Sequence, residues 1–433
     1  MYKKVLILLL ASIFWNAVLA IQELNSLKAE LMPIRFENTP ILRKGVGYHE
    51  PMTWGVMSQD LQSYAWPPYQ SERYLVDQSL MKLIRRAGFD HVRLSVDPGP
   101  FVSANGEQRE QLIQVLLRNI VLINKYDLAV VVDLHPIDMI KLYSCSELIR
   151  PEKFQLLLKT IRSIALALNV IGASKVALEP FNEPCMDPDS DGDGKWNSYM
   201  KTIHDEIRIN NKNVLIIISA NRWGQLDGLF HLDVNSYRDS NVKFTFHYYN
   251  PFEYTHQGMG ADGNLLLTRS FSGGIGFPSD IAGLYNFLPV FLGRLDALQT
   301  TQTKRQNLRL RGLKDLTYYF LEGGSISKIE KDFDKVARWA LQNNILPEQI
   351  YVGEFGVVDK VLNGCLNLDS KVIGRETWIQ KVRESSEIHG FGWSYWALTS
   401  NCTGMQLVRE VDPRSLDENI IRSLGMIHSG FRN

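Results

Sequence analysis

The sequence predicts a single (β/α)8 barrel, a ring of eight parallel strands surrounded by helices. The chain has 433 residues, of which 45% are hydrophobic and 22% charged, so it can bury a large core. From residue 44 to about residue 428, short runs rich in β-branched and aromatic residues alternate with amphipathic helical stretches. Near-continuous apolar strands separated by helices favour a parallel sheet, and eight such units favour a closed barrel.

The alternative fold is an open, doubly wound sheet. No Gly-x-Gly-x-x-Gly motif follows an early strand, so a dinucleotide site has no support. Helices between the strands are predicted by apolar residues that recur at spacings of three and four, such as Leu112, Val115, Leu116, Ile120 and Ile123. The eight predicted strands cover residues 45–49, 91–96, 129–135, 176–183, 214–219, 242–249, 350–356 and 391–396.

A long insertion follows the sixth predicted strand. It covers residues 250–324, which is 75 residues, whereas such connections usually have about two to six. Two helical patterns, at 281–298 and 310–321, indicate an ordered subdomain at the carboxyl ends of the strands. Two interpretations stay open: the subdomain lines the substrate cleft, or it packs at a distance from it.

The first twenty residues have the pattern of a signal peptide. Lys3 and Lys4 precede an apolar run over residues 5–15, and small residues stand at the cleavage positions before residue 21. We therefore expect a signal peptide at 1–20, a single (β/α)8 domain at 21–433, and a secreted or periplasmic protein. The alternative is an uncleaved membrane anchor, although the run is shorter than the ~20 residues of a span.

The charge balance argues against several classes of partner. There are 47 Lys and Arg and 47 Asp and Glu, and loss of the two signal-peptide lysines leaves 45 − 47 = −2. Neither value supplies the basic field that nucleic acid or an anionic membrane requires. We therefore expect a neutral substrate, no nucleic acid, no membrane span after signal cleavage, and a monomer.

Four cysteines survive cleavage, enough for two disulfides in an oxidising compartment. No Cys-x-x-Cys pair is present, and the spacing does not fit zinc. Three connectivities are possible, and the position of each cysteine favours one of them. Cys145 and Cys185 follow the third and fourth strands, and Cys365 and Cys402 follow the seventh and eighth. Because neighbouring strands bring their following loops together, we expect the pairs Cys145–Cys185 and Cys365–Cys402.

Reactive groups in a barrel of this kind lie at the carboxyl ends of the strands. A single polar residue there is often a helix cap or an ion-pair partner, and a single tryptophan is usually core packing. Eight such residues on six strands are harder to explain in that way and indicate a site. They are Arg93, His135, Asn182, Glu183, His247, Tyr249, Glu354 and Trp396.

Two of these residues, Glu183 and Glu354, are carboxylic acids on strands that face each other across the barrel. Cleavage of a glycosidic bond needs one carboxylic acid to protonate the departing oxygen and one carboxylate to attack the anomeric carbon. Arg93 close to Glu354 would keep that group ionised, while Glu183 would serve as the acid.

Six short segments, in order along the chain, resemble the signature segments of glycoside hydrolase family 5, the cellulase family of clan A. Asn-Glu-Pro after a fourth strand together with Glu-Phe-Gly after a seventh is the most specific part of this resemblance. Residues 247–258 further resemble a bacterial endoglucanase-like branch of the family. The six segments are residues 88–93, 132–135, 181–184, 246–249, 353–356 and 392–396.

The resemblance implies a retaining mechanism with Glu183 as acid/base and Glu354 as nucleophile, and carboxyl groups about 5 to 5.5 Å apart. The sequence departs from the family's pattern at Pro136, where many members have a second histidine. Residues 45–49 also match that pattern only loosely. The remaining roles are implied as follows: Asn182 binds the sugar 2-hydroxyl, Arg93 and Tyr249 control Glu354, His135 and His247 line the cleft, and Trp396 is a stacking floor.

Further aromatic residues near strand ends are candidates for stacking on sugar rings. Trp223, close after the fifth strand, is the preferred one. The others are Trp54, Trp66, Tyr69 and Trp393, and each of the five has core packing as its alternative.

A run of aspartates directly after Glu183 is a weak calcium candidate. Its ligands would be Asp187, Asp189, Asp191 and Asp193, in the pattern Asp-x-Asp-x-Asp-Gly. The glutamate that completes an EF-hand loop is missing, so the alternative is a solvated acidic turn. We expect no other cofactor.

The sequence therefore predicts a secreted retaining β-glycosidase, and an endo-β-1,4-glucanase fits it best. The same mechanism on mannan, β-1,3-glucan, xyloglucan or a glycolipid is the nearest alternative. Two alternatives come from other classes: a non-catalytic carbohydrate-binding protein, and a metal-dependent barrel hydrolase that uses Asp133, His135, His247 and His256.

Overall fold

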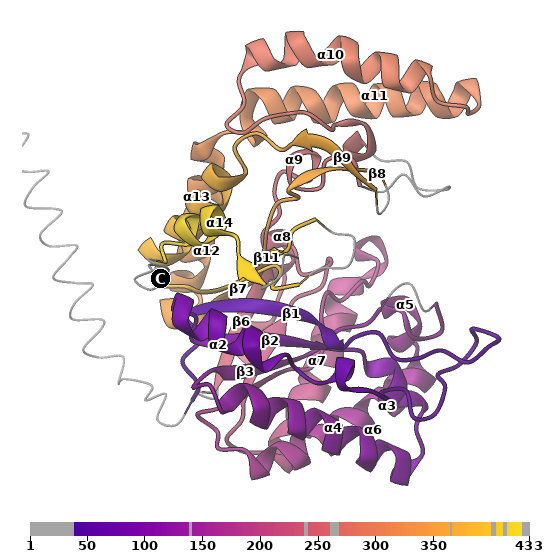
Figure 1. Cartoon of the computed structure of the whole chain (residues 1–433), viewed down its shortest axis with the longest axis vertical. Coiled ribbons are helices and arrows are strands. Elements are labelled where there is room, and N and C mark those ends of the chain that lie inside the picture. Colours follow the sequence, from indigo (N-terminus) through magenta and orange to yellow (C-terminus); the bar gives the residue numbers. More distant parts are fainter. Residues whose placement is uncertain are drawn as a thin grey trace, which may run out of the picture. The chain divides into compact units, whose positions relative to one another are not determined.

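A computed structural model describes residues 39–137, 141–237, 241–259, 268–363, 366–399, 404–409 and 414–426. Eight parallel strands close into a barrel in the order β1-β2-β3-β4-β5-β6-β7-β10 (Figure 1). The predicted fold class is confirmed. The strands are β1 (Lys44–Met52), β2 (His91–Val96), β3 (Ala129–Leu134), β4 (Val176–Glu179), β5 (Leu215–Ser219), β6 (Val242–His247), β7 (Ile350–Phe355) and β10 (Gly392–Tyr395).

Helices surround the strands and bury one face each. In α4 the buried residues are mainly the predicted apolar stripe, and the Asn105 side chain caps the first turn by accepting from the Gln108 backbone N–H. The helices outside the insertion are α2 (Gln78–Ala87), α3 (Pro98–Ser103), α4 (Gly106–Asn124), α5 (Cys145–Leu148), α6 (Pro151–Ala167), α7 (Gly192–Asn210), α8 (Leu226–Leu229), α12 (Ile326–Gln342), α13 (Arg375–Ile388) and α14 (Glu418–Ser423).

Buried apolar side chains form two clusters, one on each face of the barrel strands. The larger cluster packs toward the helices, and the smaller one includes Val131, Ala177 and Ile217. Two acidic residues lie one layer further toward the carboxyl ends, since Asp133 of β3 pairs in register with Glu179 of β4. The apolar cluster therefore supports a polar layer above it.

Some of the predicted strands end at a later residue than the strands in the structure. β4 ends at Glu179 rather than at residue 183, because Pro180 has no N–H to continue the ladder. Tyr249 and Trp396 also lie just beyond their strands. These residues therefore stand on the loops at the carboxyl-terminal face.

The insertion after β6 is helical, as predicted. Its two long helices, α10 (Ile281–Asp296) and α11 (Gln302–Tyr318), lie side by side (Figure 1). They approach closely at Gly312, where an added Cβ would stand 2.0 Å from the Phe291 ring. α11 begins eight residues before the predicted pattern because its first two turns are largely polar. The insertion also contains α9 (Phe252–Thr255), the 3₁₀ turn η6 (Thr268–Phe271) and the π-helical turn η7 (Tyr319–Gly323).

The prediction missed one antiparallel hairpin between β7 and α13, formed by β8 (Lys360–Asn363) and β9 (Leu366–Lys371). The dipeptide Asn363-Gly364 is a hairpin signal that would have identified it. A second short pair, β11 (Val408–Arg409) with β12 (Ser415–Leu416), was also missed.

Two sequence predictions lie outside the described residues: the signal peptide at 1–20 and the pair Cys365–Cys402. Among the helices that the structure describes, none has both the length and the apolar character needed to cross a bilayer.

Candidate active site

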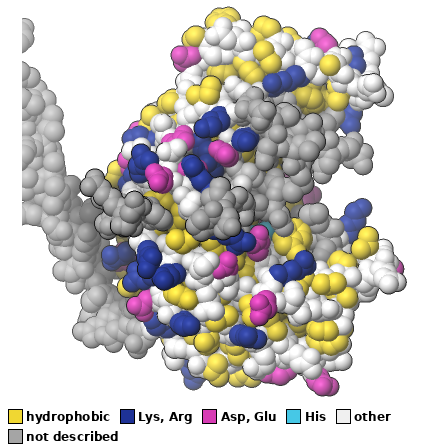
Figure 2. Space-filling view, viewed as in Figure 1, with side chains coloured by type: hydrophobic (Ala, Val, Ile, Leu, Met, Phe, Trp, Pro, Cys, Tyr) yellow, Lys and Arg dark blue, Asp and Glu magenta, His cyan; other side chains and the backbone are white. Residues whose placement is uncertain are grey.

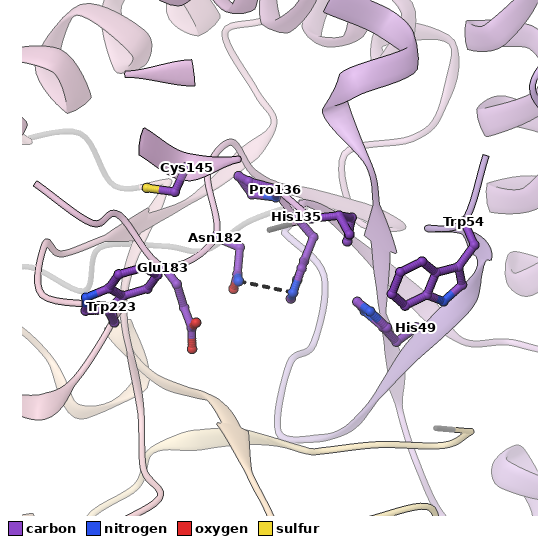
Figure 3. A pocket seen from close by; sticks show the side chains of 9 residues that line it. His49, Trp54, His135, Pro136, Cys145, Asn182, Glu183 and Trp223 are labelled. Atoms are coloured by element: carbon purple, nitrogen blue, oxygen red, sulfur yellow. Dashed lines mark hydrogen bonds between the residues drawn. The ribbon is translucent and has the colours of Figure 1, made fainter. Parts of the chain in front are cut away.

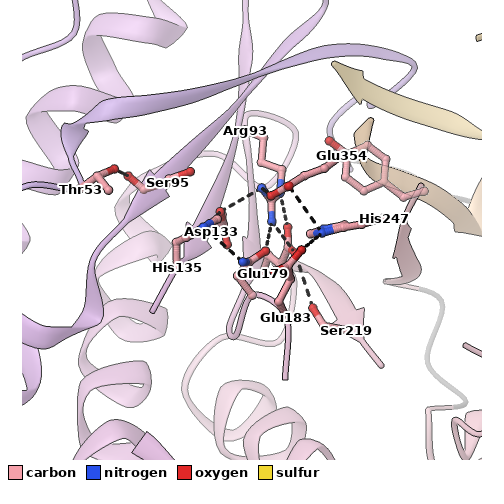
Figure 4. A network of polar contacts seen from close by, with 12 residues as sticks. Thr53, Arg93, Ser95, Asp133, His135, Glu179, Glu183, Ser219, His247 and Glu354 are labelled. Atoms are coloured by element: carbon pink, nitrogen blue, oxygen red, sulfur yellow. Dashed lines mark hydrogen bonds and ion pairs between the residues drawn. The ribbon is translucent and has the colours of Figure 1, made fainter. Parts of the chain in front are cut away.

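Arg93 is the centre of a buried polar network at the carboxyl ends of the strands (Figure 4). Its Nε and one Nη donate to both oxygens of Glu179, at 2.7 and 2.9 Å. The other Nη lies 2.7 Å from Glu354 and 3.1 Å from Asp133. A further bond of 2.7 Å reaches the amide oxygen of Asn182. One guanidinium thus fixes side chains from three other strands or their loops.

Charge in this network is strongly coupled. Burial by itself would lower the pKa of Arg93, but the charges of Asp133, Glu179 and Glu354 outweigh it and raise that pKa well above its ordinary value. Burial raises the pKa of Asp133 to about 6 although the Arg93 charge acts against it. The guanidinium is therefore a permanent cation next to Glu354.

The two predicted catalytic carboxyl groups face each other. His247 Nδ1 lies 2.8 Å from a Glu183 oxygen and 3.6 Å from a Glu354 oxygen. One oxygen of each glutamate and a His247 ring nitrogen all lie within 4.8 Å of one another. Glu183 is about one third exposed, whereas Glu354 is buried. One group thus reaches into the cavity and the other is enclosed.

Local backbone geometry directs Glu183 into this position. Its φ is +48°, in the left-handed region that residues other than glycine seldom adopt. Gly353, directly before Glu354, makes room on the opposite side, because an added Cβ would stand 2.9 Å from His247 Nε2. The backbone at Glu183 and the absence of a side chain at Gly353 in β7 thus both serve the site.

Tyr249 holds Glu354 from the other side. Its hydroxyl donates to the second carboxylate oxygen at 2.8 Å. Burial, followed by the charge of Glu354, raises the pKa of the Tyr249 phenol well above its ordinary value. The phenol is therefore neutral and donates a hydrogen bond to the carboxylate.

Three histidines at the site are neutral near pH 7. Burial lowers the pKa of His135 to about 4, lowers that of His247, and lowers that of His49 well below its ordinary value. His135 Nδ1 lies 2.8 Å from Asp133, and its Nε2 lies 3.3 Å from the Asn182 amide nitrogen. The carboxylate must accept, so Nδ1 carries the proton and Nε2 accepts from the amide.

A cavity of 250 Å³ lies on one side of Glu183 (Figure 3). Its walls include Asn182, His135, His49 and Trp54. The Nδ1 of His49 and the Nε1 of Trp54 are buried without a hydrogen-bond partner among the described residues. The other lining residues are Pro136, Ile137, Cys145 and Trp223.

Trp396 packs beside this cavity. Its ring is nearly parallel to that of His135, with an interplanar angle of 12° and centroids 5.6 Å apart. It is 8% exposed, and an added Cβ at Gly47 would stand 2.8 Å from it. The predicted stacking floor is therefore mostly covered by protein.

Trp223 is 47% exposed and stands on a tight turn after β5. Arg222, Trp223 and Gly224 have consecutive positive φ angles of 65°, 59° and 64°. The Trp223 N–H donates to the Pro184 carbonyl and the His247 N–H donates to the Gly224 carbonyl, which joins the loops after β4 and β5 to the end of β6. Trp223 is thus a rigid, accessible ring next to Glu183.

Two of the other proposed aromatic platforms are wrong. Trp393 is fully buried, because it lies within β10 and packs against Phe89 and Phe355, and Tyr69 is buried beside Tyr74. Trp54 lines the cavity, whereas Trp66 is exposed and does not line it.

A second cavity, of 660 Å³, lies beyond Glu183 and Trp223. Residues from β6, from the loop after it and from the insertion form its other walls. They are Gln225, His247, Tyr249, Phe252, Glu253, His256, Thr268, Arg269, Arg311 and Asp315.

The four aspartates after Glu183 do not form a calcium cluster among the described residues. Asp187 accepts from the Asp189 backbone N–H. Asp193 instead pairs with Arg222, whose nitrogens lie 2.7 and 3.0 Å from one of its oxygens. Within the part of the chain that the structure describes, the group of ligand atoms close enough for a metal is Glu183, His247 and Glu354.

The residues proposed for a metal-dependent hydrolase do not converge either. Asp133 and His135 bond each other, and Arg93 already neutralises the carboxylate. His256 lies against Tyr249 and within 2.9 Å of the Thr255 hydroxyl. A cation there would compete with bonds that the protein already makes.

Sequence reasoning missed two residues of the site. Glu179 is fully buried and bonds Arg93 through both oxygens. Its signal was an acidic residue inside an otherwise apolar strand, which is rare without a partner. His49 also belongs to the site, and its position near the end of the first strand was the available signal.

The disulfide Cys145–Cys185 is present and the prediction for this pair is confirmed. It joins the loops after β3 and β4, two residues from Glu183. Cys145 lines the smaller cavity. The bridge therefore ties down the backbone that carries the site.

Replacing both Cys145 and Cys185 with alanine is expected to lower the free energy of unfolding by about 3 to 4 kcal/mol. The bridge closes a loop of 40 residues, whose entropy it removes from the unfolded chain. Urea unfolding of the variant and the wild type measures the difference. An unchanged midpoint and slope would contradict the expectation, and the double variant leaves Cys365 and Cys402 intact.

The comparisons with known proteins agree with this geometry. A sequence model of the cellulase family (glycosyl hydrolase family 5) matches residues 49–401. Endoglucanase C of Acetivibrio thermocellus is 25% identical over 322 residues, covering 73% of this chain and 82% of the relative. Endoglucanase 3 of Fibrobacter succinogenes is 23% identical over 335 residues, covering 75% of this chain and 46% of the relative.

Solved structures share the fold. A hyperthermophilic endo-β-1,4-glucanase in complex with substrate superposes with a TM-score of 0.61 at 21% identity, covering 90% of this chain and 99% of that one. The cellulose synthase subunit Z from Clostridioides difficile gives 0.57 at 22% identity, covering 89% and 99%. With a family match over most of its length, the chain belongs to the cellulase family, glycosyl hydrolase family 5, and is a β-glycoside hydrolase.

Proposed function

We propose that the protein is a secreted endo-β-1,4-glucanase that works by double displacement. The observation that carries the mechanism is the pair of carboxyl groups, since oxygens of Glu183 and Glu354 lie within 4.8 Å of each other. Retaining enzymes place these groups about 5 to 5.5 Å apart, and inverting enzymes about 6.5 to 9.5 Å. The spacing leaves no room for a water between Glu354 and the anomeric carbon.

Glu354 is the nucleophile in this proposal. The bond from Arg93 and the bond from Tyr249 each satisfy one of its oxygens and fix the orientation of its carboxyl group. Glu354 attacks the anomeric carbon, and the departing oxygen takes the proton of Glu183. In the second step Glu183 removes a proton from water, which displaces the sugar from Glu354.

Glu183 suits the acid/base role because it lies partly exposed at the junction of the two cavities. His247 contacts it at 2.8 Å and orients its carboxyl group. Asn182 stands directly beside it, with its amide nitrogen shared with His135 and directed along the wall of the smaller cavity. The reactive sugar is therefore placed in the smaller cavity, with its 2-hydroxyl near Asn182.

The substrate follows from the relatives named endoglucanase and from the balanced surface, where basic and acidic side chains are interspersed on the face in Figure 2. Export follows from the pattern of residues 1–20.

A panel of polysaccharides tests the proposal. We expect the most new reducing ends, and a rapid fall in viscosity, with soluble β-1,4-glucan, and less with mannan, β-1,3-glucan or xyloglucan. The first product seen by NMR should be the β-anomer, and EDTA should leave turnover unchanged. An α-anomer as the first product would refute double displacement. A higher rate on another glycan would identify that glycan as the preferred substrate. Loss of activity with EDTA would favour a metal-dependent hydrolase. Glu354→Ala serves as the blank.

A further inference from the structure

The larger cavity is on the leaving-group side of the proposed proton donor. Glu183 and Trp223 line both cavities, whereas Asn182 lines only the smaller one. A proton donor stands beside the oxygen that departs, so the space beyond it, away from Asn182, receives the departing sugar. Its volume of 660 Å³ lies within the usual range for a ligand pocket.

The far wall of this cavity comes from the insertion. Arg311 and Asp315 stand four residues apart on α11 and therefore share one face of that helix. Arg269 of η6 and Glu253 of α9 complete the wall. Two basic and two acidic side chains balance, which suits a neutral ligand with many hydroxyl groups better than an anion.

Two of these four side chains, Asp315 and Arg269, already contact other residues of the wall. The Thr268 hydroxyl donates to Asp315 at 2.6 Å. The Arg269 guanidinium lies 5.9 Å from the centre of the Phe252 ring. Glu253 is partly buried, and its burial raises its pKa, with the charge of Asp315 adding to the effect and those of Arg269 and Arg311 opposing it.

Arg311 differs from the other three. It is exposed, it lines the cavity, and within the described part of the chain it makes no hydrogen bond or ion pair. A guanidinium offers five N–H donors in a planar fork, which matches two neighbouring hydroxyl oxygens as it matches a carboxylate. Its N–H donors are therefore available to a ligand in this cavity.

We propose that Arg311 is a substrate-binding residue that holds the departing sugar by donating to two of its hydroxyl groups, while that sugar packs on Trp223. The inference rests on the proposed function and adds the recognition of the leaving group by the insertion. It identifies the preferred substrate as a glycan that continues as sugar beyond the cleaved bond.

Arg311→Ala tests the inference on two substrates. The leaving group of cellotetraose is a sugar. The leaving group of 4-nitrophenyl β-cellobioside is an aryl group, which has no pair of hydroxyl groups. We expect kcat/KM for cellotetraose to fall about tenfold or more, as for the loss of a hydrogen bond to a charged group, and kcat/KM for the aryl substrate to fall much less. Arg311→Lys, which keeps the charge without the fork, should recover only part of the loss.

Arg309→Ala is the matched control, since Arg309 lies on the same helix but pairs with Asp296 at 2.9 Å outside the cavity. It should change neither rate. Equal losses on both substrates in Arg311→Ala, or no loss on cellotetraose, would overturn the inference while the proposed function stands. A wild-type protein that cleaves neither substrate would refute the proposed function and this inference together.

Discussion

Glu354→Ala is expected to lower kcat/KM on both cellotetraose and an aryl cellobioside by about 10⁴-fold or more. In the proposed mechanism the substitution removes the group that attacks the anomeric carbon, so no glycosyl-enzyme should form with either leaving group. The fold should persist, although Arg93 and Tyr249 each lose a bond to the carboxylate. Rates on both substrates and the unfolding midpoint measure these effects.

Azide distinguishes the nucleophile from a group with another role. It fits the space left by the Glu354 carboxylate and attacks an activated β-glycoside directly, so the rescued product should be the α-azide. A β-configured azide would show that the nucleophile is still present and that the assignment is wrong. Glu348→Ala is a suitable control, because Glu348 is exposed and stands just before β7, at the opposite end of the strand that carries Glu354.

Glu183→Ala is expected to lower kcat/KM on cellotetraose by about 10² to 10⁴-fold, the usual contribution of general acid catalysis. The loss should depend on the leaving group. A sugar is a poor leaving group unless its oxygen is protonated, whereas 2,4-dinitrophenolate leaves without protonation. With the activated substrate the glycosyl-enzyme should therefore still form and accumulate as a burst.

The second half of the reaction provides the complementary test. In the proposed mechanism no base activates water once Glu183 is removed, but azide needs no base and should displace the sugar from Glu354. The product should be the β-azide, opposite in configuration to that from Glu354→Ala. Equal losses on cellotetraose and on the dinitrophenyl substrate would contradict the role of Glu183 as proton donor.

Much of the fold followed from short-range patterns. The strands were visible as apolar runs because parallel barrel strands are buried on both faces. Placing polar residues at strand ends then brought Arg93, Glu183, Glu354 and Tyr249 into one region, since carboxyl ends of parallel strands meet on one face. The order of strands around the barrel also predicted the Cys145–Cys185 bridge.

Other features depend on contacts that no local pattern reports. Burial of Trp393 is decided by which face of β10 meets the helices, and a register shift in its pairing with β7 obscures the alternation. Arg311 lies on a largely polar helix, so its sequence neighbourhood resembles any solvated surface. Its approach to the cavity of Glu183 is set by how the whole insertion folds back.

The two ends of the helical pair α10 and α11 lie next to each other, because the Ser279 N–H donates to the Gly324 carbonyl at 2.8 Å. A segment whose ends meet can be lengthened, shortened or exchanged with little effect on the elements that flank it. The wall formed by Arg311 and Asp315 is thus a separable unit, attached to a barrel that carries both proposed catalytic residues, Glu183 and Glu354. Variation among homologous chains, and transplantation between them, should therefore concentrate in residues 280–323 and leave the bond-cleaving chemistry unchanged.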